Sequence, residues 1–306
     1  MLNYLSSLPG AVAQGIIWGI MAIGVYITYK VLDFADLTVD GSICTGAAVC
    51  AVLVTNGVNV WLAMLVAMLA GMLAGLATGL FHTFMGIPPI LAGILTQLIL
   101  WSVNLKIMGS KANMALSARN YALVVAQLWR SRSILILFAF AAAIIALLYW
   151  FFGTEIGASI RATGCNQNMS RAQGINTNIT KVLALVISNG IVALSGALLA
   201  QYLGNADINM GRGAIVIGLA AVIIGNALFS RIAKNFAVKL LTVIVGGVIY
   251  YLVYQTVIYL GLDADLLKML SALVVAVFLA VPYWKKKYFS RRKHPAKNVK
   301  GENDRA

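Results

Sequence analysis

The sequence carries little charge. Only 10% of its 306 residues are charged, whereas 61% are hydrophobic. Soluble domains carry charge on about a quarter of their residues, because charged side chains cover the surface that faces water. The composition therefore excludes a single soluble domain and predicts an integral membrane protein.

Residues that carry catalysis or bind metals are also scarce. The two histidines, His82 and His294, have no His-Glu-x-x-His motif or paired carboxylates beside them, which excludes metalloproteases and acid–base hydrolases. Cys44, Cys50 and Cys165 are unclustered, which predicts three buried thiols rather than a metal site or a disulfide framework. A Gly-x-x-x-x-Gly-Lys-Ser/Thr sequence is missing, so the chain cannot bind ATP through a P-loop of its own. We expect no catalytic residues and no metal site.

The chain also lacks the apolar–polar alternation of a membrane β-barrel. Runs such as "SILILFAFAAAIIALLYWFF" (residues 133–152) are apolar on every side, and a helix needs about 20 such residues to cross a bilayer. The sequence predicts an all-α polytopic helical bundle of about nine spans. These are residues 10–30, 41–55, 60–82, 88–107, 133–152, 180–203, 214–229, 237–260 and 267–284.

The orientation follows from the end of the chain. Residues 285–306, "KKKYFSRRKHPAKNVKGENDRA", contain nine Lys and Arg and two acidic residues, so we expect a cytoplasmic C-terminal tail. Nine spans then place the N-terminus outside. The basic residues of segment 108–132 fall on the outer side, against the rule that Lys and Arg are enriched in cytoplasmic loops. The net charge of +14 indicates affinity for anionic lipid rather than for nucleic acid.

Glycines recur at four-residue spacing, at Gly15 and Gly19 and at Gly71, Gly75 and Gly79. This spacing lets helix backbones approach closely in lipid. It predicts either dense packing within the chain or a subunit interface.

Three acidic residues, Asp33, Asp36 and Asp40, interrupt the apolar pattern between the first two spans. They predict a discontinuous segment near residues 33–42 whose freed backbone groups line a cavity or a cytoplasmic mouth. An ordinary cytoplasmic loop with acidic capping residues is the alternative. Polar residues at membrane depth face protein or water rather than lipid, and they bond between helices or line a pathway. Our pathway candidates are Asp36, Asp40, Ser42, Thr96, Gln97 and Asn189.

The longest interior connection is residues 153–179. Its alanines, arginines and glutamines are interrupted at Gly164 and Asn166, which predicts a short helix, a glycine turn and a second short helix ending near Gly174. Such an elbow either docks into a groove on a soluble partner or rests on lipid headgroups.

Three separated motifs resemble one family, the permease subunits of bacterial ABC importers of the branched-chain amino acid and ribose type. The elbow resembles the family's cytoplasmic coupling region. "ADLTVDGS" (residues 35–42) is similar to the break after an early span of the sugar permeases, with Asp40 where glycine is expected. "LSGALLAQYLGNADINMGRGAIVIGLAAVIIG" (residues 194–225) resembles the paired late spans. The matching elbow positions are Gly157, Arg161, Ala162, Gly164, Asn168, Arg171, Ala172, Gly174 and Asn176.

Residues 86–113 most resemble permeases associated with aromatic amino acids such as tryptophan or tyrosine. The resemblance covers residues 10–284. It implies one transmembrane permease domain, residues 1–284, followed by the basic tail, residues 285–306.

The resemblance implies the permease subunit of a binding-protein-dependent importer for a small polar solute, an amino acid, in a bacterial inner membrane. Its partners would be ATPase subunits that bind ATP and Mg²⁺, an extracytoplasmic binding protein and a second permease copy or homologue. Segment 108–132, with Arg119 and "YALVVAQLWR", would be a platform for the binding protein or a surface helix on lipid. Two other interpretations are a self-sufficient secondary transporter coupled through Asp36 or Asp40, and a scaffold without transport.

Overall fold

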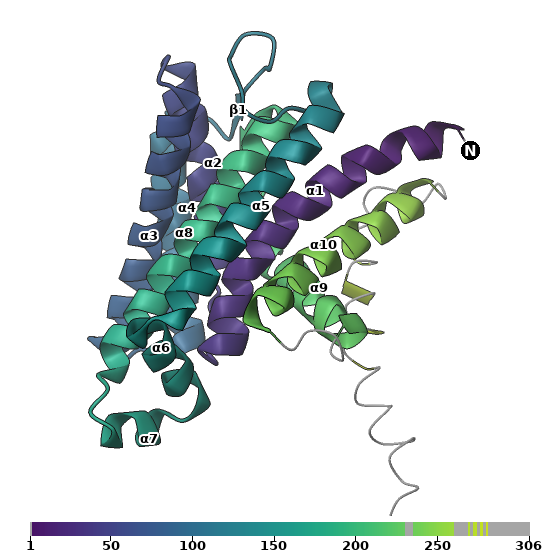
Figure 1. Cartoon of the computed structure of the whole chain (residues 1–306). Helices are drawn as coiled ribbons and strands as arrows, with labels where there is room; N and C mark the ends of the chain where they lie inside the picture. The colour runs from purple at the N-terminus through teal and green to yellow at the C-terminus, as the bar shows by residue number, and fades with distance from the viewer. Residues whose placement is uncertain are drawn as a thin grey trace, which may run out of the picture.

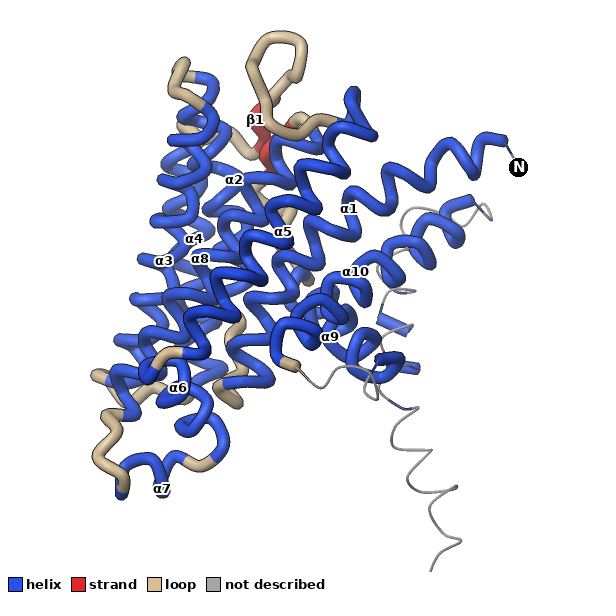
Figure 2. Tube along the Cα trace, viewed as in Figure 1, coloured by secondary structure: helices blue, strands red, loops and turns tan. Residues whose placement is uncertain are grey.

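The computed structural model describes residues 2–229 and 235–259, together with six positions between 269 and 280. Within these residues the chain is a bundle of helices with short connections (Figure 1; Figure 2). The helices are α1 (Leu2–Tyr26), η1 (Ile27–Val31), α2 (Val39–Thr55), α3 (Val60–Thr83), α4 (Pro89–Ile107), η2 (Gln127–Trp129), α5 (Arg130–Gly153), α6 (Glu155–Cys165), α7 (Gln167–Ala172), α8 (Thr177–Leu203), α9 (Ala214–Phe229) and α10 (Phe236–Tyr259).

Eight of the nine predicted apolar segments coincide with helices. Six of these helices are long and apolar enough to cross a membrane, whereas α2 and α9 are shorter apolar helices. The ninth predicted segment, residues 267–284, lies largely outside the described residues, and the tail lies wholly outside them. The prediction of an all-α polytopic membrane protein is confirmed.

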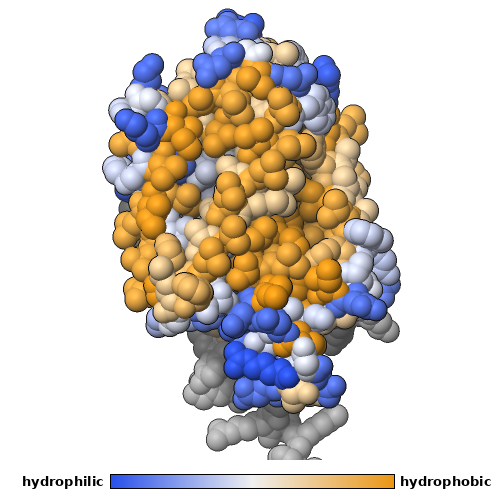
Figure 3. All heavy atoms as spheres, turned by 90° about the vertical axis from the view of Figure 1, so that its left-hand side faces the viewer, coloured by the Kyte–Doolittle hydropathy of each residue, from blue (hydrophilic) through white to orange (hydrophobic). Residues whose placement is uncertain are grey.

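A belt of exposed apolar side chains covers the face of the bundle formed by α3 and α4. Figure 3 shows this belt between hydrophilic ends. Leu73 on α3 is 65% exposed and Leu98 on α4 is 63% exposed, as is expected of side chains that contact lipid. The belt identifies the surface that meets the hydrocarbon.

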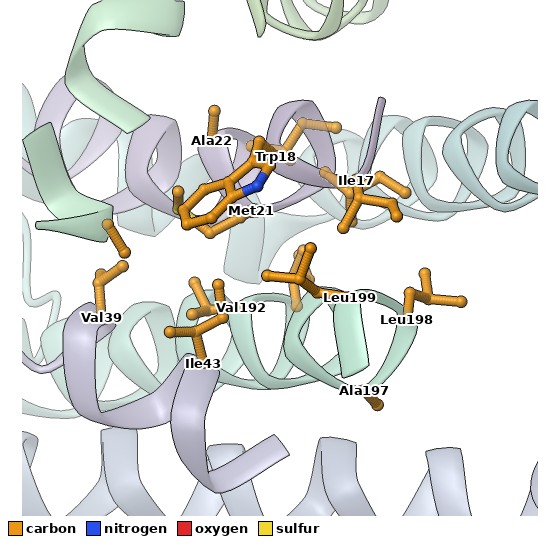
Figure 4. Packing of buried hydrophobic residues seen from close by; sticks show 14 of the residues in the cluster. Ile17, Trp18, Met21, Ala22, Val39, Ile43, Val192, Ala197, Leu198 and Leu199 are labelled. Carbon is orange, nitrogen blue, oxygen red and sulfur yellow. The ribbon is translucent and has the colours of Figure 1, made fainter. Parts of the chain in front are cut away.

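The centre of the bundle is formed by α1 and α8. Ile17 and Met21 of α1 lie against Val192 and Leu199 of α8, with Ile43 of α2 beside them (Figure 4). Lipid tails are as apolar as these side chains, so close packing rather than the hydrophobic effect holds such helices together.

Glycines allow two of the helix contacts to be close. A methyl group on Gly15 of α1 would lie 2.6 Å from the Cα atom of Val248 on α10. A methyl group on Gly75 of α3 would overlap the carbonyl oxygen of Leu185 on α8. The predicted dense packing within the chain is therefore observed at both glycine patterns.

The sequence did not predict a small antiparallel strand pair. Strand β1 (Asn113–Ala115) pairs with β2 (Asn205–Asp207), and Met114 lies opposite Ala206. Strands of three residues are too short to show a periodic pattern. The pair joins the connection after α4 to the end of α8.

The interpretation of segment 108–132 as a surface-lying helix is wrong. Leu123, Val124, Val125 and Ala126 are buried, and the backbone is helical only from Gln127 onward. The backbone N–H of Val124 donates to Oε1 of buried Gln201 on α8, 3.1 Å away. The apolar residues therefore cover the end of the bundle instead of resting on lipid.

The strand pair and α6–α7 lie at opposite ends of the bundle, as Figure 1 shows. This arrangement agrees with the prediction that segments 108–132 and 153–179 lie on opposite sides of the membrane.

Replacing Gly75 by alanine tests the contact between α3 and α8. We expect Gly75→Ala to lower the free energy of unfolding by about 1–3 kcal/mol, because the added methyl group forces the two backbones apart. The measurement is the thermal unfolding midpoint in detergent. Gly153→Ala is the matched control, because no atom lies within 4 Å of its added methyl group. Equal midpoints for the two variants would contradict the close approach.

Candidate functional site

The predicted break between the first two spans is present. α1 passes into the π-helix η1, residues 32–38 are outside any helix, and α2 begins at Val39. Asp33 has a φ of 57°, in a region that non-glycine residues rarely occupy. The chain therefore changes direction sharply here, and its freed backbone groups need partners inside the protein.

Asp36 lies at the centre of a buried polar cluster. Its Oδ1 accepts a hydrogen bond from the backbone N–H of Thr38 (2.9 Å), and its Oδ2 accepts one from Nδ2 of Asn189 on α8 (2.8 Å). The hydroxyl of Ser42 donates to Oδ1 of the same Asn189 (2.6 Å). Asp36, Ser42 and Asn189 are each at most 1% exposed. These bonds join the break to both α2 and α8.

A chain of three threonine hydroxyls extends this cluster to α3 and α4. Thr38 contacts Thr78 of α3 (2.6 Å between the Oγ1 atoms), and Thr78 donates to Oγ1 of Thr96 on α4 (2.9 Å). Thr96 in turn donates to the carbonyl oxygen of Ala92 (3.0 Å). Four of the six pathway candidates, Asp36, Ser42, Thr96 and Asn189, therefore belong to one network, although their role as a pathway stays a prediction.

Sequence reasoning missed Thr78 as part of this network. The available indication was its position, three residues after Gly75 and seven after Gly71, on the glycine-bearing face of α3. A small polar residue on the face that packs against other helices is suited to bond across them.

Asp40 and Gln97 lie apart from the network. The Asp40 carboxylate accepts hydrogen bonds from the backbone N–H groups of Gly213 and Ile215, each 2.9 Å away, at the start of α9. It therefore caps a helix whose first residues lie 173 to 175 positions away in the sequence, rather than its own helix, which neither interpretation of the acidic segment included. Gln97, near the middle of α4, lines a cavity of about 240 Å³ together with Asp40.

The elbow is a helix–turn–helix, as the sequence predicts, but the turn lies two residues after Gly164. Gly164 lies inside α6, and the turn is at Asn166, whose Oδ1 accepts from the backbone N–H of Met169 (3.0 Å) at the start of α7. Gly174, with a φ of 81°, follows the end of α7. Cys165, the last residue of α6, is exposed, so the prediction of three buried thiols is wrong at this position.

Gly164 and Gly157 hold the elbow against the bundle. A methyl group on Gly164 would overlap the carbonyl oxygen of Val31 in η1, and one on Gly157 would overlap the backbone at Phe152. The hydroxyls of Thr163 on α6 and Thr180 on α8 lie 3.0 Å apart. The elbow is thus packed directly against the π-helix that precedes the break.

Most of the other matched elbow positions face solvent. Ala162 is partly exposed, and Asn176 caps α8 by accepting from the backbone N–H of Asn178 (3.1 Å). Exposed positions are Arg161, Asn168, Arg171, Ala172, Gly174 and Asn176. The elbow therefore has glycines that pack closely against neighbouring backbone, and exposed residues such as Arg161 and Asn168 whose side chains face outward.

Within the described residues, no three His, Cys, Asp or Glu side chains are grouped closely enough to hold a metal ion.

Comparisons with known proteins identify the family. A model of the family described as branched-chain amino acid transport system / permease component matches residues 8–281. The chain is 40% identical over 278 residues to a tyrosine transport system permease protein of Clostridioides difficile, covering 90% of this chain and 91% of that protein. It is 27% identical over 249 residues to a fructose import permease protein of Bifidobacterium longum, covering 79% of this chain and 68% of that protein.

The structure resembles a chain of PsaBC from Streptococcus pneumoniae, solved in complex with a Fab. The TM-score is 0.55 at 16% identity, covering 96% of this chain and all of the other. At this identity the likeness shows a shared fold only.

Exchanging the two partners of the central hydrogen bond tests the cluster. Asn189→Asp alone places two carboxylates against each other, and we expect it to lower the free energy of unfolding by about 3–5 kcal/mol. Adding Asp36→Asn restores one carboxylate facing one amide, so the double variant should regain at least half of that loss. Thermal unfolding midpoints in detergent measure both effects. The Asp36–Asn189 bond would be contradicted if the double variant lost as much stability as the two single variants, Asp36→Asn and Asn189→Asp, lose in total.

Proposed function

Because this chain belongs to the branched-chain amino acid transport permease family, we propose that it is the membrane-spanning subunit of an ATP-driven importer for an amino acid. The family match and the tyrosine transport permease among its relatives support this proposal. ATP and Mg²⁺ would be bound by separate ATPase subunits, because this chain contains no P-loop sequence.

The observation that carries the proposal is the elbow formed by α6 and α7. It is a helical surface element with exposed Arg161, Asn168 and Arg171, and it projects from one end of the bundle. The buried side of the same element contacts η1 and α8. A partner that binds the exposed residues would therefore act on the helices beneath them.

The path from the elbow into the membrane is short. Gly164 contacts the backbone of Val31, and the chain leaves helical geometry at the next residue. Asp36, four residues further on, is bonded to α8. A displacement of the elbow would thus reach the break and the polar network without passing through flexible linkers, and would support rocking of one half of an importer against the other.

The remaining partners follow from this role. We place the elbow and the C-terminal tail on the cytoplasmic side of a bacterial inner membrane, with a second permease copy or homologue completing the pathway. The strand pair, Arg119 and segment 108–132 would form the platform for an extracytoplasmic binding protein on the opposite side.

A secondary transporter would need a carboxylate that is free to titrate or to bind an ion. Asp36 is buried, and each of its oxygens accepts a hydrogen bond that stabilises the fold. These bonds favour the ATP-driven importer.

Reversing the charge of Arg161 tests the docking of the ATPase. Arg161 is exposed on α6, so we expect Arg161→Glu to reduce co-purification of the ATPase subunit about tenfold or more, because a charged contact is replaced by repulsion. Lys106→Glu, an exposed charge reversal on α4 near the opposite end, is the matched control and should retain full association. Undiminished ATPase association in Arg161→Glu would refute the role of the elbow.

A further inference from the structure

A cavity of about 240 Å³ lies between α2, α4 and the turn that precedes α9. It is distinct from the buried network of Asp36 and Asn189. Its lining residues are Asp40, Gly41, Cys44, Gln97, Leu98, Trp101, Asn104, Ile208 and Arg212. Pockets for drug-sized ligands occupy roughly 300–1,000 Å³, so this volume suits a smaller solute.

Asn104 gives the first indication of a ligand. It is only 1% exposed, and neither its Nδ2 nor its Oδ1 has a hydrogen-bond partner within the described residues. A buried amide without partners destabilises a protein, and the great majority of buried polar groups are satisfied. Asn104 therefore has an amide NH2 group and a carbonyl oxygen that the described residues leave without partners, at the wall of a cavity.

Arg212 gives the second, independent indication. Its side chain is exposed at the rim of the cavity, and its guanidinium forms no hydrogen bond or ion pair with any residue that the structure describes. Gln97, on the same cavity wall, lies near the middle of α4, a candidate span. A cation at this depth faces a watery path or a ligand rather than lipid.

The turn that carries Arg212 is fixed rather than loose. Gly213 is bonded to Asp40, as described above, and the backbone N–H of Gly211 donates to Sγ of Cys44 (3.1 Å). The Cys44 thiol donates to the carbonyl oxygen of Ile208 (3.3 Å). These bonds hold the backbone on both sides of Arg212 against the first turns of α2, so that its position at the rim is preorganised.

Asp40 supplies the opposite charge. Each of its oxygens accepts one backbone N–H, which leaves further lone pairs on a carboxylate that has about four acceptor sites. The cavity thus combines a fork-shaped cation, a fixed carboxylate and an unpaired amide, with Leu98 and Trp101 exposed at its edge. Arginine is suited to bind a carboxylate through two parallel hydrogen bonds.

We infer that this cavity is a solute site within the permease, and that it recognises the zwitterionic head of an α-amino acid. Arg212 pairs with the solute carboxylate, while Asp40 and Asn104 accept from its ammonium group. The side chain of the solute extends past Trp101. The inference rests on the proposed function, because it assigns the transported amino acid to a place in this chain.

Binding of L-tyrosine to the full-length permease in lipid nanodiscs tests the site directly, without the ATPase. We expect Arg212→Gln to weaken binding about tenfold or more, because charge-assisted hydrogen bonds are lost, and Arg212→Lys to weaken it less. Asn104→Leu should weaken binding and also raise the unfolding midpoint of the ligand-free protein by about 2 °C, since it removes an unsatisfied amide. If Asn104 only stabilised the fold, Asn104→Leu would lower the unfolding midpoint instead.

Two controls and two analogues complete the test. Lys30→Gln and Ser102→Leu, at exposed positions outside the cavity, should bind L-tyrosine like the unmodified protein. Tyramine, which lacks the carboxylate, and 3-(4-hydroxyphenyl)propionate, which lacks the ammonium group, should each bind at least about tenfold more weakly.

The outcomes separate this site from the proposed function. Absence of L-tyrosine binding, equal binding of tyramine, or unchanged affinity in Arg212→Gln and Asn104→Leu would overturn the site even if the assembled importer takes up L-tyrosine with ATP. The predicted losses of binding would support the site. If they are accompanied by uptake that needs no ATP, the proposed coupling to an ATPase fails and the site stands.

Discussion

The structure depends on one constraint of the bilayer, which is that every backbone group freed by a break in a helix needs a partner inside the protein. The chain breaks its helices at residues 32–38 and again between Leu203 and Ala214. A carboxylate supports each break. Asp36 binds the backbone of Thr38 within the first break, and Asp40 binds the backbone at the start of α9 after the second.

The first of these carboxylates also joins the break to α8. Asn189 of α8 reaches Asp36 and Ser42 only because the backbones are close, and glycines make them so: a methyl group on Gly46 of α2 would overlap the backbone at Ala193 of α8. Close packing and polar bonding therefore act at the same contact. The elbow adds to this contact from one end, since α6 packs against the π-helix that leads into the first break.

Much of this arrangement could be predicted from the sequence. Apolar length located eight helices, because a span must be long and apolar on all sides. The three aspartates marked the first break, and the polar composition of residues 153–179 predicted the elbow. What failed depended on tertiary contacts. Gly164 was expected to form a turn, whereas it permits a close approach to Val31, and a glycine in a sequence does not show which of these applies.

The polar residues illustrate the same limit. Their presence at membrane depth predicted partners, but the partners of Asp40 lie 173 and 175 residues away, and Thr78 contacts Thr38 in the first break and Thr96 on α4. Asn104 is one of several polar residues within apolar segments of the sequence. Its burial without a hydrogen-bond partner, which distinguishes it from the others, is visible only in the structure. Such pairings depend on how helices face one another, which one sequence does not determine.

In the proposed importer, ATP hydrolysis in a partner subunit acts through the elbow to drive solute through this chain. Uptake of L-tyrosine into proteoliposomes that contain the permease, its ATPase and its binding protein, with ionophores collapsing proton and sodium gradients, tests it most directly. Coupling through the elbow predicts accumulation only when ATP is supplied on the side of the elbow. Accumulation driven by an ion gradient in the absence of ATP would contradict it.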